Sequence, residues 1–262
     1  MLDNDFSAFC KTHRDNIDML ALDSGAWSYN NAKTSIPYLA TIQPYREYLQ
    51  TFGHYFDLYF NLDRVFDDDA DELNYQNQLH LENAGLQPIP VVHDPMGDEI
   101  EFYIDHGYKT IALGSRQNGN RNVLNHAFEK FSSAGIDVHL FGNMKFSSLT
   151  DFPVWSCDTT AWAQRGKWGF LYYWNQNNPG LDKTDKIYLE EQINASHKHK
   201  HYYSSYEFRS ELDQYLNDEV KISPTDFYGI EGEFNKRIAN LHFYVKLEER
   251  LNEIHRRKGF NT

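Results

Sequence analysis

The feature that most constrains the fold is a series of short apolar runs separated by stretches with helical spacing. The runs are, in chain order, 19-MLALD-23, 55-YFDLYFNLD-63, 89-IPVVH-93, 110-TIALG-114, 137-DVHLFG-142, 153-PVWSCD-158 and 168-WGFLYYW-174. Segments with helical spacing lie between them at 38–53, 71–85, 97–107 and 121–135, and several close on glycine, which tolerates a left-handed C-terminal turn. Buried strands that alternate with helices predict βαβ units and a parallel sheet.

About seven predicted strands before residue 175 favour a TIM-type (β/α)8 barrel over an open sheet, because no G-x-G-x-x-G motif opens the first unit. From about residue 185 the pattern becomes helical, over 206–217 and 231–258. The last helix carries an amphipathic stripe formed by Phe234, Ile238, Leu241, Val245, Leu247, Leu251 and Ile254. We therefore expect a single α/β domain over 1–262, in which 185–262 is mainly helical and packs on the barrel through this stripe.

The composition is that of a folded protein, with 40% hydrophobic and 16% aromatic residues. The chain has no apolar run of membrane-spanning length and no basic, apolar leader, so we expect a soluble protein of the cytoplasm, or of the host cytoplasm if a phage encodes it. Cys10 and Cys157 are the two cysteines, which argues against a disulfide framework and a cysteine zinc site. A zinc site made of the histidines in 197-HKHKH-201 would have to bind its cation beside the positive charge of the neighbouring lysines, which opposes binding. We expect no cofactor and no zinc.

The net charge of −13 does not indicate a general affinity for nucleic acid, because proteins that neutralise phosphates usually carry a basic surface. Any such contact requires a local basic patch. The candidates are 197-HKHKH-201, Arg116, Arg121, Arg165, Lys167 and 255-HRRK-258. Taken singly, each of these is more often a solvated surface than a phosphate contact.

Polar residues and glycines stand at the ends of the predicted strands. They are Asp23, Asp63, His93, Gly114, Gly142 and Asp158. In a parallel barrel the ligand site lies at the C-terminal ends of the strands. A single aspartate at such a point is as often a helix N-cap, but three aspartates and a histidine favour a site.

Two carboxylates that face one site are typical of glycosyl transfer, in which one attacks the anomeric carbon and the other protonates the leaving group. Trp27 and Phe141 are large rings beside the strand ends. Together they would hold a flat ligand between them, although each ring alone is more often part of a core.

Taken in order, six segments resemble the tRNA-guanine transglycosylase superfamily, and most of all its divergent phage and bacterial paralogues that insert 7-deazaguanines into DNA. The matching segments are 22-LDSGAW-27, 60-FNLD-63, 88-PIPVVH-93, 111-IALGS-115, 138-VHLFG-142 and 155-WSCDTTAW-162. The resemblance covers about residues 19 to 170 and rests on the order and spacing of the segments together. The helical C-terminal part adds nothing specific to it.

The resemblance implies a role for each matched position. Asp158 would be the nucleophile and Asp23 the general acid and base, whereas Asp63 would accept hydrogen bonds from the Watson–Crick edge of a purine. The other implied base contacts are His93, at a glutamine position of the tRNA enzymes, and Ser24, Gly114, Gly142, Trp27 and Phe141. Arg165, with Lys167 nearby, falls near arginines that hold the polynucleotide backbone.

Two departures from the tRNA enzymes bear on the substrate. Those enzymes are longer, and they carry a zinc subdomain with three cysteines and one histidine, which a chain with two cysteines cannot build. The resemblance therefore implies exchange of guanine in DNA for a 7-deazaguanine such as preQ0, with DNA, the free base and conceivably a helper protein as partners. The alternatives are the same exchange on tRNA, a hydrolase that cleaves the base or sugar bond, and a barrel that only binds.

Overall fold

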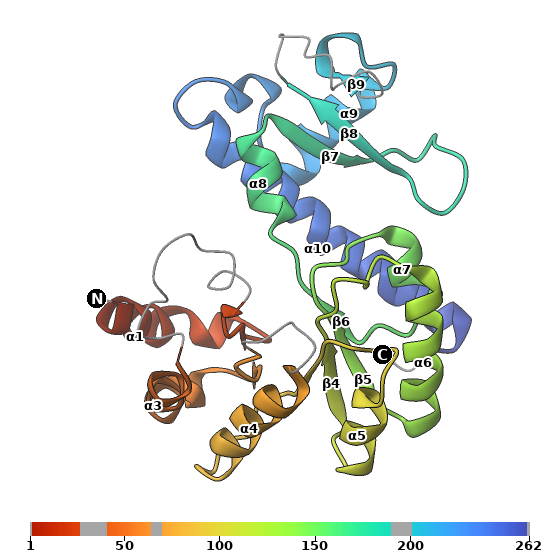
Figure 1. Cartoon of the computed structure of the whole chain (residues 1–262). Coiled ribbons are helices and arrows are strands. Elements are labelled where there is room, and N and C mark those ends of the chain that lie inside the picture. Colours follow the sequence, from red (N-terminus) through yellow and green to blue (C-terminus); the bar gives the residue numbers. More distant parts are fainter. Residues whose placement is uncertain (1, 27–40, 64–69, 190–200, 261–262) are drawn as a thin grey trace. The chain divides into compact units, whose positions relative to one another are not determined.

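The computed structural model describes residues 2–26, 41–63, 70–189 and 201–260 (Figure 1). They belong to two compact units. The first unit is Met1–Asn143 with Val154–Cys157, and the second is Met144–Pro153 with Asp158–Thr262. The single domain over 1–262 that the sequence led us to expect stays a prediction.

The first unit alternates strands and helices. Its strands are β1 (Ala21–Leu22), β2 (Leu58–Tyr59), β3 (Val91–Val92), β4 (Thr110–Leu113), β5 (Asp137–Leu140) and β6 (Ser156–Cys157). Its helices are α1 (Leu2–His13), η1 (Arg14–Asn16), α3 (Ile42–Phe52), η3 (Gly53–Tyr55), α4 (Ala70–Glu82), α5 (Glu99–Asp105) and α6 (Arg121–Ala134). The predicted alternation of strands and helices is confirmed.

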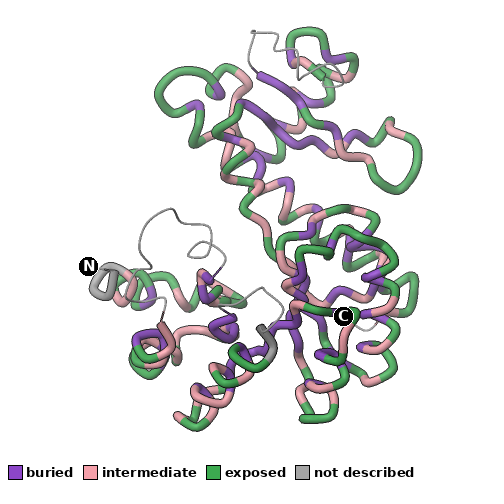
Figure 2. Tube along the Cα trace, viewed as in Figure 1, coloured by how far each residue is buried: buried purple, intermediate pink, exposed green. Residues whose placement is uncertain are grey.

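The six strands lie in sequence order and run parallel. β1 pairs with β2, and β3 to β6 form a four-stranded sheet. A parallel bridge between Phe60 and Ile89 joins the two sets. The middle strands β3, β4 and β5 are largely buried (Figure 2), whereas β1, β2 and β6 are only partly buried or exposed.

The parallel sheet is strongly curved. The ring of Phe60, next to β2, lies 4.6 Å from the ring of His139 and 4.7 Å from that of Phe141, measured between centroids. β3 and β4 lie between β2 and β5, so a flat sheet would hold these strands about 14 Å apart. Side chains of β2 and β5 therefore meet across the concave face of the sheet.

Three predicted helices of the first unit end as expected. Gly85, Gly107 and Gly135, which follow α4, α5 and α6, have φ of 79°, 82° and 66°. A side chain with a Cβ is disfavoured in this left-handed region, so glycine suits these positions. Gly53 differs, since its φ of −57° is right-handed and it begins η3.

The second unit mixes helices with a small sheet. Its strands are β7 (Phe170–Trp174), β8 (Thr184–Tyr188) and β9 (His201–Tyr202). Its helices are α7 (Phe146–Asp151), α8 (Ala161–Lys167), η5 (Tyr203–Ser205), α9 (Arg209–Tyr215), η6 (Leu216–Val220, a π-helix), η7 (Pro224–Phe227) and α10 (Gly232–Lys258).

The strand β7 corrects one expectation. We expected 168–174 as a further strand of the parallel barrel, but β7 pairs antiparallel with β8, and β9 adds to β8 in parallel. The connection over 175–183 gives β7 an antiparallel partner that is close in the chain, which a hairpin supplies without a crossover. Among the described strands no pairing joins β7 to β6, so a closed eight-stranded barrel is not shown.

The helix α10 packs on the second unit through a face that shares only part of the predicted stripe, since Leu247 and Leu251 are buried. Phe234, Ile238, Leu241 and Val245 are 59%, 36%, 43% and 49% exposed, so this half of the stripe is not core. The buried face also includes Asn240, whose side chain accepts from the Tyr172 N–H at 2.8 Å and donates to the Phe170 carbonyl at 3.0 Å. Hydrogen bonding to the edge of β7 therefore sets the rotation of the helix.

Candidate functional site

The centre of the candidate site is Asp63, a buried carboxylate four residues beyond β2. The Ser24 hydroxyl, which follows β1, donates to Asp63 Oδ1 at 3.0 Å. His93 Nε2, which follows β3, lies 3.1 Å from Asp63 Oδ2. Because β1, β2 and β3 are parallel neighbours, their C-terminal ends bring these three predicted residues together.

Glu99 holds the loop that carries His93. Its Oε2 atom accepts from the backbone N–H groups of His93 and Asp94 at 2.7 and 2.8 Å. Glu99 is 5% exposed and opens α5, so the carboxylate fixes the turn between β3 and that helix. Sequence analysis did not single out Glu99, although an acidic residue in the first turn of a predicted helix is a signal for such a contact.

Gly114 lies against the ring of His93. A Cβ at this position would come within 2.7 Å of Val91 Cγ1 and 3.0 Å of His93 Cε1. Its N–H donates to the Val92 carbonyl at 2.9 Å, which keeps the end of β4 beside β3. Glycine is thus required here for close approach, and the position borders the Asp63–His93 pair.

Asp23 lies near the same carboxylate but is exposed. Its Oδ1 accepts from the Gly25 N–H at 3.1 Å, which fixes the turn after β1. Burial, followed by the negative charges of Asp23 and Asp63, raises the pKa of the Tyr45 phenol well above its usual value. Tyr45 donates to the Phe60 carbonyl at 2.7 Å, so it stays neutral and lies within electrostatic range of both aspartates. Sequence analysis did not single out Tyr45.

Phe141 and Gly142 follow β5 on the same side of the sheet. The half-buried Phe141 ring lies 4.5 Å from His139, in addition to its contact with Phe60. The Asn118 amide donates to the Phe141 carbonyl at 3.2 Å, and Gly142 turns the chain with a φ of 64°. Phe141, one of the two rings expected to hold a flat ligand, therefore belongs to the aromatic cluster on the concave side of the sheet.

The remaining predicted site residues do not belong to the described part of the first unit. Asp158 belongs to the second unit and directly follows β6 in the chain. Arg165 and Lys167 lie on α8, with the Arg165 guanidinium 5.0 Å from the centroid of the Trp168 ring. Trp27 lies outside the described residues.

The geometry distinguishes this cluster from a serine-hydrolase triad. In such a triad the serine hydroxyl is activated by the histidine. Here the Ser24 hydroxyl donates a hydrogen bond to Asp63, and the Asp63 carboxylate lies between Ser24 and His93. A carboxylate has about four lone-pair directions, so Asp63 retains acceptor capacity for N–H groups of a ligand after both bonds are made.

Within the part of the chain that the structure describes, no three histidine, cysteine, aspartate or glutamate side chains are grouped so as to hold a metal ion. No described helix is both long and apolar enough to cross a bilayer.

Comparisons of the chain with protein-family models, with curated proteins and with solved structures found no match.

Proposed function

We propose that this chain is a DNA-guanine transglycosylase, which exchanges guanine for a 7-deazaguanine such as preQ0 through a covalent aspartyl intermediate. The observation that carries the proposal is the buried cluster of Ser24, Asp63 and His93 at three neighbouring strand ends. A purine such as guanine offers N–H donors on one edge, and a held carboxylate is the acceptor that this edge requires.

The proposed fold is a TIM-type barrel. The sequential order of six parallel strands supports it, and so does the contact of Phe60 with the rings of β5. Both features are typical of a barrel wall. In such a wall the residues that follow the strands share one rim, where the ligand site of a barrel lies.

The first proposed half-reaction breaks the bond between guanine and sugar. A carboxylate oxygen of Asp158 attacks C1′ of a flipped-out deoxyguanosine and forms an ester bond. The electron pair of the C1′–N9 bond moves to guanine, which takes a proton from Asp23. In the second half-reaction Asp23 accepts the N9 proton of the incoming base, N9 bonds to C1′, and the Asp158 ester breaks. Two displacements retain the configuration at C1′.

The proposed experiment is incubation of the purified chain with guanine-containing DNA and labelled preQ0, followed by digestion to nucleosides. We expect label in the deoxynucleoside fraction and release of one guanine for each base incorporated. Parallel reactions with tRNA and without added base separate the alternatives. Label in tRNA alone would favour the tRNA enzyme, and guanine release that needs no added base would favour a hydrolase. The absence of both labelled nucleic acid and released guanine would contradict the proposal.

A further inference from the structure

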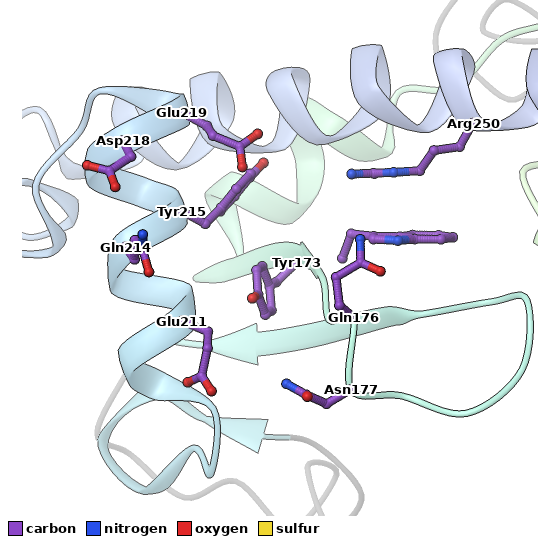
Figure 3. A pocket seen from close by; sticks show the side chains of 10 residues that line it. Tyr173, Gln176, Asn177, Glu211, Gln214, Tyr215, Asp218, Glu219 and Arg250 are labelled. Atoms are coloured by element: carbon purple, nitrogen blue, oxygen red, sulfur yellow. The ribbon is translucent and has the colours of Figure 1, made fainter.

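The second unit contains a cavity of about 300 Å³ that none of the residues proposed above lines. The end of β7, α9, η6 and α10 form its walls (Figure 3). Two of these walls are aromatic, since Tyr173 and Tyr215 direct their rings toward the same space. Aromatic walls favour a flat ligand, which stacks on them or meets their edges.

Arg250 supplies a hydrogen-bond donor to this cavity. Its guanidinium lies over the Trp174 ring, with 4.6 Å from Cζ to the centroid. The Nη1 atom is buried and has no hydrogen-bond partner among the described residues. A buried donor without an acceptor is unfavourable, so a ligand oxygen at this position would be stabilised.

Carboxylates supply the acceptors. Glu211 comes from α9, while Asp218 and Glu219 come from the π-helix η6. Burial lowers the pKa of the Arg250 guanidinium, and the charge of Glu219 partly offsets this, so Glu219 lies within electrostatic range of Arg250. Single π-helical turns are often found at functional sites. The turn ends at Lys221, whose φ of 62° is strained for a residue other than glycine.

The charges limit the class of ligand. Three carboxylates around the cavity repel an anion, and a cation would meet the positive charge of Arg250 and leave Nη1 unpaired. A neutral, flat molecule with a carbonyl beside N–H groups satisfies both kinds of side chain. Guanine-type bases carry this lactam edge, whereas adenine has no carbonyl on its ring.

We propose that this cavity binds a guanine-type base, with Arg250 donating to the carbonyl oxygen and Glu219 accepting from the ring N–H or the amino group. The site is separate from Asp63 and does not rest on the proposed transglycosylase activity. It would give the second unit a contact with a nucleobase.

The test is calorimetric titration of the full chain with guanosine, adenosine, spermidine and inorganic phosphate. We expect guanosine to bind at least about tenfold more tightly than adenosine. Arg250→Gln and Glu219→Gln should each weaken guanosine binding by roughly tenfold to a hundredfold. Arg257→Gln and Glu253→Gln, which change an exposed pair on the same helix, are the matched controls and should leave binding unchanged.

Asp63→Asn separates this cavity from the candidate site of the first unit. Guanosine binding that depends on Arg250 and Glu219 should persist in that variant, and base exchange should persist in Arg250→Gln. Guanosine binding unaffected by both cavity variants would overturn the inference. Preferential binding of spermidine or phosphate in the cavity would also overturn it. Glu219 is exposed, so Glu219→Gln should remain folded, and the guanosine-to-adenosine comparison on the unaltered chain tests the inference without any variant.

Discussion

The Nε2 atom of His93 lies 3.1 Å from the Oδ2 atom of Asp63, and the side chains of His93 and Asp63 are 8% and 12% exposed. Each group loses hydration through burial and is compensated by the other, and Asp63 also accepts a hydrogen bond from the Ser24 hydroxyl. A change at either position therefore alters both the stability of the fold and the acceptor that the proposed ligand requires.

Asp63→Asn should weaken binding of preQ0 or guanine by roughly tenfold to two-hundredfold, because the amide presents an NH₂ group where the base needs an acceptor. Affinity by calorimetry and the melting temperature are both measured, with exposed Asp137→Asn at the start of β5 as control. A lower melting temperature with unchanged affinity would mean that Asp63 only holds the turn after β2.

Gly114→Ala should displace the His93 ring, since the added Cβ would lie 3.0 Å from His93 Cε1 and 2.7 Å from Val91 Cγ1. We expect a loss of about 1–3 kcal/mol in unfolding free energy, measured with urea, and weaker base binding. Gly53→Ala is the matched control, because its Cβ would meet only Leu49 Cβ at 3.9 Å and its φ is −57°. Equal effects at both glycines would contradict the role of close packing at His93.

Asp158→Asn and Asp23→Asn should affect the covalent intermediate differently. Without the proposed nucleophile, Asp158→Asn should form no covalent intermediate and still bind the free base. Asp23→Asn should form it about 10²–10⁴-fold more slowly, because it lacks acid and base assistance. Trapping of the intermediate with DNA, followed by denaturing electrophoresis, distinguishes them. A covalent adduct in Asp158→Asn would assign the nucleophile elsewhere.

Protonation of Asp57 at low pH should lower the free energy of unfolding. Hydrogen bonds from the Leu20 N–H, at 2.6 Å, and from the Arg14 guanidinium lower the pKa of this carboxyl. Because the pKa is lower in the folded state, the contribution is complete above the unfolded value of about 3.9 and is lost as pH falls through the folded value. Urea midpoints between about pH 2 and 6 should therefore drop less steeply in Asp57→Asn than in the unaltered chain or in Asp105→Asn.

Asn240→Ala should destabilise the second unit by about 1–3 kcal/mol or more, since it leaves the buried Tyr172 N–H and Phe170 carbonyl without their partner. Urea unfolding followed by circular dichroism measures this effect. Asn252→Ala, at an exposed position on the same helix, should change stability by less than about 0.5 kcal/mol. Similar losses in the two variants would show that the contact with β7 adds little.

The local pattern of the chain predicted the elements well in the first unit. Apolar runs gave the parallel strands, and Gly85, Gly107 and Gly135 marked helix ends, because strand burial and left-handed turns depend on a few neighbouring residues. The same strand-end pattern pointed to Asp63 and His93. It did not point to Glu99 or Tyr45.

Pairing and exposure were decided by tertiary structure. The run at 168–174 reads as another buried strand, yet its partner is the strand at 184–188, which periodicity does not specify. The apolar spacing of α10 identified only part of its buried face, Leu247 and Leu251, because that face also includes the polar Asn240, whose side chain bonds to the edge of β7. Local sequence determines what an element is and which groups it carries. Which partner covers it depends on hydrogen bonds and packing between residues distant in the chain, so only the folded structure settles them.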